Sequence, residues 1–532
     1  MRVRHMMAGA VLAVAGLLGA DAAMAQKQGG VLKIYHRDNP PSASMHEEST
    51  ISTTVPFAGI YNNLVQFDQT KELHTPATII ADLAKSWAWD ATNKKITFKL
   101  NEGVKWHDGK PFTAKDVKFT FDMVAGKTNV EDFRKNPRKV WYFNIEDITV
   151  NGDYEVTFSL KDPQPSFLMM LASTFSPVYP AHVPQREMRT KPVGTGPFKF
   201  SEFKRNEFIK VVRNPDYFKK GKPYLDAIEL RIIDNRSTRV LAFQAGEFDM
   251  TFDSDITVPL LKDMEKQAPK AQCTLRYTNV SVNLIVNSGV APFDNEKIRR
   301  AMAMALDRAS FNKILDDGKA ALGGAMQPLP DGQWAMSKEM TEKLPGYSPD
   351  IEKSQAEARK IMEALGYSAA KPLKVKVSTR NIAIYRDPAV ILIDQLKKIH
   401  FDAELEPVDT TIWHAKAARK DYQIGLNLTG IGIDDPDAQL IENYSCKSER
   451  NYTQYCNPEV EKLIFAQSKI TDVAERKKMV WEIERKLVED VARPIIMYQP
   501  AATCWQPHVK GIVLPRNSIY NYYRFEDVWI DK

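Results

Sequence analysis

Cysteine is scarce in this chain of 532 residues, which has four: Cys273, Cys446, Cys456 and Cys504. No two of them are spaced as CxxC, which argues against a four-cysteine metal site. Four cysteines permit three pairings, and an even number in an exported chain indicates two disulfides. Cys446 and Cys456 would close a short loop. This favours them as one pair and leaves Cys273 with Cys504 as the other.

Long apolar runs are also missing beyond residue 25. The run from Ala8 to Ala20 is shorter than the about 20 residues that span a bilayer, so a membrane anchor is the weaker interpretation. It follows a basic start and precedes Ala23-Met24-Ala25, which together are the three regions of a secretory signal peptide. No cysteine near the cleavage site offers attachment for a lipid. We therefore expect residues 1–25 to be removed after Ala25 and the mature protein to be soluble in the periplasm.

Neither a large excess of one charge nor an enzyme motif is present. The chain has 73 Lys and Arg against 67 Asp and Glu, interleaved along the sequence, which gives little support to nucleic-acid or membrane binding. There is no GxSxG, no HExxH and no GxxxxGK[ST], and the nine histidines are scattered. We therefore expect no catalytic residues, no cofactor and no metal, with a secreted hydrolase as the competing class.

Patterns typical of strands and helices alternate along the chain, which predicts a mixed α/β fold. Apolar and polar residues alternate over 154–160 and 228–232, as in strands with one buried face. Helices are predicted from Asp294, with an apolar face from Ile298 to Leu306, and from Asp472 to about Val491. A chain of this length is expected to form two or three domains.

The turn from Gly430 to Asp437 contains three carboxylates, those of Asp434, Asp435 and Asp437. Because aspartate is common in turns and at helix starts, one interpretation is a solvated acidic turn. The other is that a carboxylate in a cleft binds an ammonium or hydroxyl group of a ligand. A calcium loop is not indicated, because the alternating oxygen ligands that it needs are absent.

Several segments resemble the solute-binding proteins of dipeptide and oligopeptide ABC importers, extracellular solute-binding protein family 5. The most specific is the segment from Asp82 to Val117, which contains Leu83-Ala84-Lys85-Ser86-Trp87 and Trp106-His107-Asp108-Gly109-Lys110-Pro111-Phe112-Thr113. Others follow in the order of the family: Ile60–Val65 before it, then Pro192–Phe198, Asn214–Phe218, Ala245–Asp249, Ile298–Arg308 and Asp527–Ile530. The resemblance covers nearly the whole mature chain.

The resemblance implies a periplasmic-binding-protein fold of type II, with two lobes, an extra inserted domain and a ligand cleft between the lobes. Lobe 1 is expected to combine 26–57, 190–275 and 497–532, the inserted domain 58–189, and lobe 2 276–496. The chain would cross between the lobes near Cys273 to Asn283 and near Ile495 to Cys504, which places the second disulfide beside the hinge.

The implied function is that of a monomeric periplasmic receptor, which delivers a peptide or peptide-like solute to an ABC permease and ATPase in the inner membrane. The alternatives are a receptor for a non-peptide solute (a sugar, an opine-like conjugate or a metal chelate) and a chemosensory adaptor. Family peptide receptors bind the ligand ammonium with an aspartate in a turn like Gly430–Asp437. Aligning Asp435-Pro436 with the Asp-Pro of the family places Gly432 at that position, and Asp434 could substitute only in a shifted loop.

The remaining candidates for ligand contact follow from the same resemblance and from position in the chain. Arg386, before a helix expected over 389–398, corresponds to an arginine that meets the ligand carboxylate in dipeptide receptors, and its other interpretation is a surface arginine. Trp413 would stack on the ligand or belong to the core. The other candidates lie at strand ends and crossings: His46, Asn283, Asn287, Arg380 and Tyr385.

Overall fold

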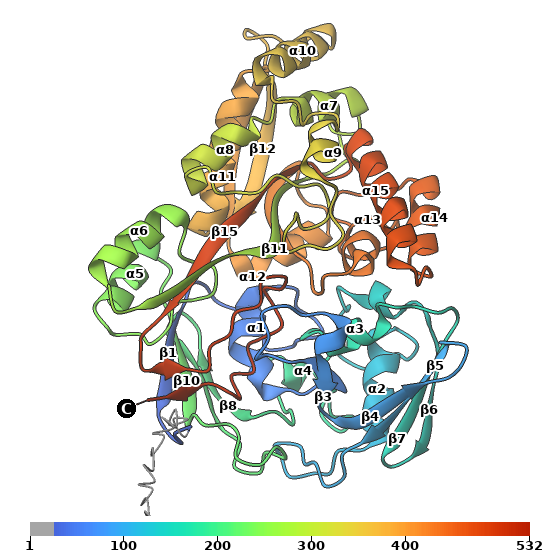
Figure 1. Cartoon of the computed structure of the whole chain (residues 1–532). Coiled ribbons are helices and arrows are strands. Elements are labelled where there is room, and N and C mark those ends of the chain that lie inside the picture. The colour runs from blue at the N-terminus through green and yellow to red at the C-terminus, as the bar shows by residue number, and fades with distance from the viewer. Residues whose placement is uncertain (1–25, 532) are drawn as a thin grey trace, which may run out of the picture.

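The computed structural model describes residues 26–531, so the expected signal peptide lies outside the described residues. Over that range, none of the helices combines the length and the apolar character that a bilayer crossing requires. Two lobes lie one above the other in Figure 1, and the long strands β11 (Gln272–Val286) and β15 (Ile495–Trp505) run from the upper lobe toward the lower one.

Lobe 1, the lower left of Figure 1, is built on a four-stranded sheet of order β1-β10-β9-β8. The predicted strand over 228–232 is confirmed as β10, which pairs parallel to β1 and antiparallel to β9. The elements of this lobe are β1 (Val31–His36), α1 (Ile51–Phe57), β8 (Phe198–Lys204), β9 (Phe208–Arg213), β10 (Ala227–Ile232), α5 (Arg236–Gln244), α6 (Val258–Gln267), β16 (Val509–Lys510) and β17 (Trp529–Ile530).

A second four-stranded sheet, β4-β5-β7-β6, lies beside lobe 1 at the lower right of Figure 1. Its side chains belong to the same continuous apolar cluster as those of the β1 sheet, so this domain is packed firmly on lobe 1. Its elements are η1 (Ala58–Ile60), β2 (Val65–Phe67), η2 (Pro76–Thr78), β3 (Ile79–Ala81), β4 (Ala84–Trp89), β5 (Lys95–Leu100), α2 (Ala114–Val124), η3 (Lys139–Tyr142), β6 (Ile145–Gly152), β7 (Glu155–Leu160), α3 (Phe167–Ala172) and α4 (Gln185–Met188).

The Pro192–Phe198 segment joins this domain to β8 by a close approach of backbone to backbone. A Cβ atom on Gly194 would lie 1.9 Å from the carbonyl oxygen of Ile60, and one on Gly196 would lie 2.5 Å from that of Gly59. Neither position has room for a side chain. The two glycines are therefore required for packing.

Lobe 2, the upper lobe, is built on a five-stranded sheet of order β13-β12-β14-β11-β15. Helices cover its faces and enclose a separate apolar cluster. Its elements besides β11 and β15 are α7 (Glu296–Met304), α8 (Arg308–Asp316), α9 (Lys338–Glu342), α10 (Ile351–Ala364), β12 (Leu373–Arg380), α11 (Ala383–Lys397), β13 (Phe401–Val408), α12 (Thr410–Ala418), β14 (Ile424–Gly430), η4 (Asp437–Ile441), α13 (Glu442–Tyr444), α14 (Pro458–Gln467) and α15 (Val473–Glu489).

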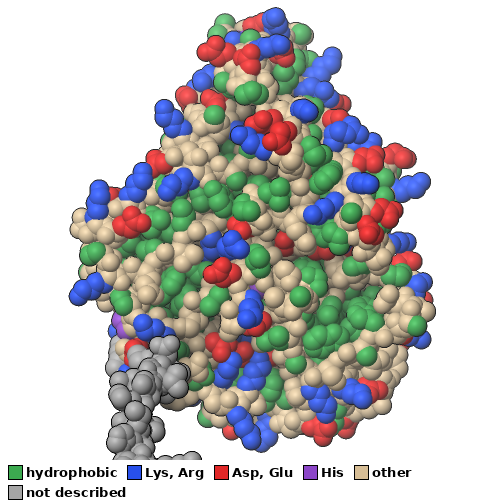
Figure 2. All heavy atoms as spheres, viewed as in Figure 1, with side chains coloured by type: hydrophobic (Ala, Val, Ile, Leu, Met, Phe, Trp, Pro, Cys, Tyr) green, Lys and Arg blue, Asp and Glu red, His purple; other side chains and the backbone are tan. Residues whose placement is uncertain are grey.

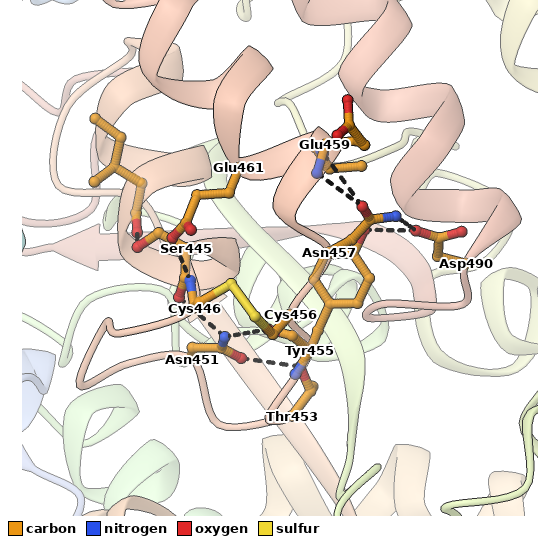
Figure 3. The surroundings of a disulfide bond; sticks show 12 residues. Ser445, Cys446, Asn451, Thr453, Tyr455, Cys456, Asn457, Glu459, Glu461 and Asp490 are labelled. Atoms are coloured by element: carbon orange, nitrogen blue, oxygen red, sulfur yellow. Dashed lines mark hydrogen bonds between the residues drawn. A yellow bond between two sulfur atoms is a disulfide. The ribbon is translucent and has the colours of Figure 1, made fainter.

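The two strands that connect the lobes pair antiparallel with each other, and their register shifts between Tyr277 and Ser281. At the lobe 1 end, the predicted disulfide between Cys273 and Cys504 joins them, with 4.1 Å between the Cα atoms. The other predicted pair, Cys446 with Cys456, is also bonded and closes a loop in lobe 2 (Figure 3). Both pairings indicated by the sequence are therefore present.

The helices begin within a few residues of the predicted positions, and side chains of the expected types cap two of them. The side chain of Asp472 accepts a hydrogen bond from the amide of Glu475, so this residue caps α15 as expected. The helix predicted from Asp294 begins at Glu296 and is capped by Asn295, because that amide side chain accepts from Lys297. The helix expected over 389–398 begins earlier, at Ala383, and contains Pro388. Proline at this position has no backbone N–H to donate to the carbonyl of Ile384, so α11 lacks one backbone hydrogen bond there.

Candidate ligand-binding site

A cavity lies where the two lobes meet, and both connecting strands contribute to its wall. Lobe 1 contributes the residues that follow β1 and begin α1, and lobe 2 contributes the ends of β12 and β14. The lining residues used below are Arg37, Thr50, Ser254, Val280, Arg380, Ile384, Tyr385, His414, Asn427, Leu428, Arg450, Tyr452, Gln499, Ile519 and Tyr520.

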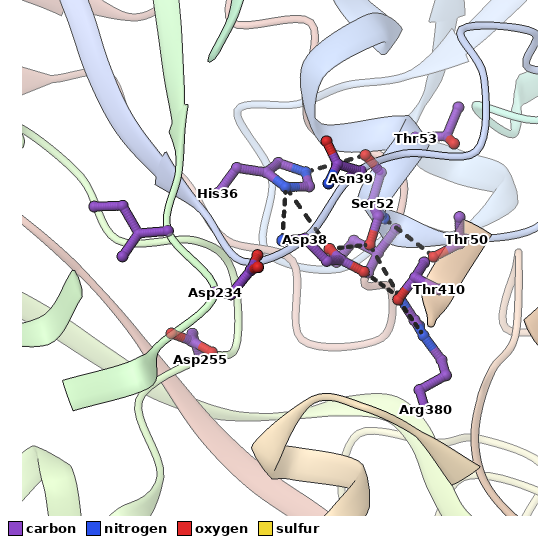
Figure 4. Close-up of polar contacts among 12 residues, drawn as sticks. His36, Asp38, Asn39, Thr50, Ser52, Thr53, Asp234, Asp255, Arg380 and Thr410 are labelled. Carbon is purple, nitrogen blue, oxygen red and sulfur yellow. Dashed lines mark hydrogen bonds and ion pairs between the residues drawn. The ribbon is translucent and has the colours of Figure 1, made fainter. Parts of the chain in front are cut away.

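The strongest contact across the cavity wall is an ion pair between the lobes (Figure 4). Nη2 of Arg380, at the end of β12, donates to Oδ2 of Asp38, just after β1, at 2.7 Å. The same guanidinium donates to Thr410 and to the hydroxyl of Tyr385. Burial opposes ionisation of Asp38, but Arg380 outweighs it and holds the pKa of Asp38 at about 2. The pair is therefore ionised at neutral pH and joins the two lobes.

The disulfide loop from Cys446 to Cys456 carries two lining residues, Arg450 and Tyr452. Inside the loop, Nδ2 of Asn451 donates to the backbone carbonyls of Ser445 and Tyr455, as Figure 3 shows. The guanidinium of Arg450 is paired with Glu442 at 2.5 Å and also reaches the carbonyl of Ser49 in lobe 1 at 3.4 Å. The short covalent loop thus positions a second arginine at the cavity.

His414, on α12, faces the same cavity as a neutral ring. Its pKa is lowered well below the ordinary value, mainly by burial and further by the positive charges of Arg380 and Arg450. Its Nδ1 lies 3.4 Å from the hydroxyl of Ser49 in lobe 1. The ring therefore provides hydrogen-bonding capacity without charge.

The structure brings two of the predicted site residues, Arg380 and Tyr385, to the cavity, and places the other seven elsewhere. Trp413 is fully buried in an apolar cluster with Ile285 and Tyr422, while its neighbour His414 faces the cavity. Arg386 is exposed on α11 and donates to Asn381. It lies outside the cavity because the helix begins before it.

His46, Asn283 and Asn287 stabilise the backbone away from the cavity. Nε2 of His46 lies 2.8 Å from the carbonyl oxygen of Pro177, and its ring packs on Tyr179. Asn283 donates to Ser281 within β11. Asn287 donates to the carbonyls of Lys420 and Tyr422, which fixes a loop.

The carboxylates of the Gly430–Asp437 turn are buried and directed away from the cavity. Asp435 accepts two hydrogen bonds from Arg476 of α15, at 2.9 and 2.7 Å. Asp437 accepts from Arg476 and also from Ser166 of the domain beside lobe 1. The interpretation as a solvated acidic turn is therefore wrong, because partners distant in the sequence neutralise two of the three carboxylates.

Asp434, the third carboxylate, lacks a cationic partner among residues 26–531, and burial raises its pKa to about 7. Its backbone carbonyl accepts from Trp334. Gly432, where the family aspartate would fall, is closed off as well, because a Cβ atom there would lie 2.4 Å from the ring of Trp141.

Asp434→Asn should make the protein more stable than the wild type at pH 8 by about 4 kcal/mol, and by about 2 kcal/mol at pH 5. The folded pKa lies above the unfolded one, so the folded state keeps a proton that the unfolded state releases. The stability from this proton is fully present below about pH 4 and is lost as pH rises through about 7. Asparagine imitates the neutral carboxyl group at every pH.

Melting curves of both proteins between pH 5 and 8 measure this effect. The matched control is Asp435→Asn, next in the chain, which weakens a buried ion pair and should lower the melting temperature at both pH values. A constant offset between Asp434→Asn and the wild type across the range would contradict the assignment.

Sequence reasoning missed most of the cavity wall: Arg37, Thr50, Ser254, His414, Asn427, Arg450, Tyr452, Gln499 and Tyr520. Two signals were available. Arg37 directly follows the first strand, and Arg450 and Tyr452 stand inside the loop that the predicted disulfide closes.

A cavity enclosed by two lobes and by the two strands that join them defines a two-lobed ligand-binding protein. Residues 78–451 match the family model of bacterial extracellular solute-binding proteins, family 5 Middle. The chain therefore belongs to the bacterial extracellular solute-binding proteins of family 5.

Curated relatives and solved structures agree with this membership. The chain is 27% identical to the oligopeptide-binding protein AppA of Bacillus subtilis over 82% of this chain and 80% of that protein. It is 26% identical to the probable di/tripeptide-binding protein 5 of Pseudomonas aeruginosa over 88% and 90%. The fold is similar to that of DppA from Helicobacter pylori in complex with the peptide STSA, with a TM-score of 0.84 at 23% identity, covering 95% and 99% of the two chains. It is also similar to AgaA of A. tumefaciens R10 in complex with agropinic acid, with a TM-score of 0.82 at 22% identity, covering 94% and 99%.

Proposed function

We propose that the protein is the periplasmic receptor subunit of an ABC importer, which encloses a peptide or peptide-like small solute and delivers it unchanged to the membrane permease. The observation that carries this proposal is the cavity between the lobes, with walls from both of them. A solute in contact with both walls binds the closed form better than the open one and so shifts the equilibrium toward closure. The permease would then recognise the closed protein.

Relatives and chemistry support the transport role. The two relatives named above are peptide-binding proteins by name, and the family consists of solute-binding proteins. No cluster of His, Cys, Asp and Glu within 26–531 is arranged to hold a metal ion. We propose that the protein acts as a monomer without enzymatic activity, and that residues 1–25 direct its export.

The domain boundaries belong to the same proposal. Lobe 1 would comprise 26–57, 190–275 and 497–532, the inserted domain 58–189, and lobe 2 276–496. The three larger sheets support this division, because the strands of each fall within one proposed unit, apart from the start of β11 and most of β15. Arg380 and Tyr385 would contact the solute from lobe 2.

Solute binding should raise the melting temperature and make the protein more compact. At a solute concentration 100 times the Kd, mass action stabilises the folded state by about 2.7 kcal/mol. Thermal-shift screening and small-angle scattering with a broad solute library measure the two effects. Recovery of the bound solute by mass spectrometry should show it chemically unchanged.

A solute that is recovered as a reaction product would contradict the receptor role. So would a protein whose melting temperature and scattering profile respond to no solute, including material extracted from the periplasm of the source cells.

A further inference from the structure

The charged side chains that line the interlobe cavity all have the same sign. Arg37, Arg380 and Arg450 face it, and none of its lining residues within 26–531 is aspartate or glutamate. Burying charges of one sign together is unfavourable unless opposite charges compensate them. What compensates each arginine therefore indicates what the cavity is built to accept.

Carboxylates of the protein neutralise only part of this charge. Asp38 is paired with Arg380. Glu442 serves two guanidinium groups, that of Arg450 at 2.5 Å and that of Arg138 behind the wall at 3.3 Å. These four buried arginines form ion pairs with only two carboxylates, so at least one guanidinium has no directly paired carboxylate.

Arg37 is the cation that lacks a partner. It is 5% exposed, its buried Nε has no hydrogen-bond partner, and none of the ion pairs formed among residues 26–531 includes it. Its guanidinium packs over the ring of Phe252 at 4.7 Å, which fixes the group without neutralising it. Arginine presents a planar set of donors that matches a carboxylate with two parallel hydrogen bonds.

This wall, in contrast, offers no carboxylate to an ammonium group, and its acceptors are neutral, such as Oε1 of Gln499. The ring of Tyr385 already lies under the guanidinium of Arg380 at 4.7 Å, and that of Tyr452 lies 5.8 Å from Arg450. The Gly430–Asp437 turn directs its carboxylates away, and Gly432 has no room for an acidic side chain beside Trp141. Much of the remaining wall is apolar: Ile51, Val280, Val282, Ile384, Leu428, Ala501 and Ile519.

We infer that the solute is a small, largely apolar organic carboxylate without a free ammonium group, and that Arg37 binds its carboxylate. This inference rests on the proposed receptor function and names the class of solute. A peptide-like ligand fits it when its amino group is acylated or otherwise blocked. A free dipeptide, with its terminal ammonium, does not.

The test uses the exported full-length chain, freed of bound solute, and a library arranged in matched sets. One set is alanyl-phenylalanine, its N-acetyl form and its C-terminal amide, and the others pair aliphatic and aromatic carboxylic acids with their amides. We expect the solutes that raise the melting temperature to be carboxylates. Their amides should not raise it, and acylation of an amine should preserve or increase the effect. Solute released from the native protein should react with a carboxyl-directed reagent and not with an amine-directed one.

The second arm measures the affinity of the best carboxylate in the library for three variants by calorimetry. Arg37→Gln should weaken binding at least tenfold and Arg37→Lys less. Neither should lower the melting temperature of the solute-free protein, because the guanidinium has no internal ion pair to lose. Arg386→Gln is the matched control: an exposed arginine of lobe 2, on the helix that carries Tyr385, whose loss should change affinity less than twofold.

Results that contradict the inference differ from those that contradict the receptor function. Stabilisation that requires a free ammonium group, or an unchanged affinity in Arg37→Gln, would overturn the inference while leaving the receptor function intact. A protein that closes on no solute and releases none would overturn the receptor function itself.

Discussion

Arg476→Met should lower the free energy of unfolding by about 3–5 kcal/mol, the cost of leaving buried charge without its partner. Arg476 lies on α15, is 2% exposed, and is the cation that binds both Asp435 and Asp437. Both carboxylates are buried, so that neither can recover hydration while the fold persists. Methionine retains an apolar stem and removes the charge together with the hydrogen bonds that the guanidinium donates.

Calorimetric melting measures this loss of stability. A second substitution tests whether the unpaired carboxylates cause it. Adding Asp435→Asn to Arg476→Met should restore part of the stability, because it removes one of the stranded charges. The control is Arg485→Met on the same helix, whose exposed ion pair with Glu489 should contribute less than about 0.5 kcal/mol. If the double variant were less stable than Arg476→Met, the ion pair would not be the cause.

Breaking the ion pair between Asp38 and Arg380 should weaken solute binding about a hundredfold while leaving the solute-free protein nearly as stable as before. The two residues belong to different lobes, and in the structure they form an ion pair in which both are buried (Figure 4). In an open protein both side chains would be hydrated. The ion pair would therefore contribute free energy only to closure of the lobes. A hundredfold change corresponds to about 2.7 kcal/mol.

A double-mutant cycle of Asp38→Asn and Arg380→Met isolates that coupling from any direct contact of Arg380 with the solute. We expect a coupling of about 2 kcal/mol in the binding free energy and close to none in the melting of the solute-free protein. Lys262 and Asp317 form the matched control, an exposed ion pair of 2.6 Å between α6 and the end of α8. Their coupling should stay below about 1 kcal/mol. Equal coupling in both measurements would mean that the pair forms without solute.

Features that depend on neighbouring residues were predictable from the sequence. The alternation over 154–160 places one face of β7 in the core, and the aspartate at 472 caps α15 as its chemistry requires. The pairing of Cys446 with Cys456 followed from the short loop between them. Each of these depends on interactions over a few residues, which the order of residues displays directly.

The cavity wall could not be read from the sequence in the same way, because its chemistry depends on partners distant in the chain. Arg37 directly follows a β-strand, and Arg386 lies in the helix that follows another. Arg37 is buried without an ion pair, whereas Arg386 is exposed. The turn with three aspartates suggested a ligand carboxylate, but Arg476 binds two of them. Trp413 and His414 are adjacent, and only the helix orientation decides which of them faces the cavity.

The distribution of surface charge does not indicate the function, either in the sequence or in the structure. On the face shown in Figure 2, lysine and arginine are mixed with aspartate and glutamate over both lobes, in agreement with the interleaved charges of the sequence. The imbalance of charge that matters for function lies inside the molecule, between the lobes, where composition does not reveal it.

The turn after β14 has a thermodynamic consequence for solute capture. Ile431, Ile433 and Ala438 belong to lobe 2, but their side chains pack into the apolar cluster of lobe 1 and the domain beside it. Separation of the lobes would bring these side chains into contact with water. Removing apolar surface from water lowers the heat capacity, so the enthalpy of solute capture becomes more negative as temperature rises. Near 25 °C, water released from this turn gives closure a favourable entropy that does not depend on which solute is enclosed.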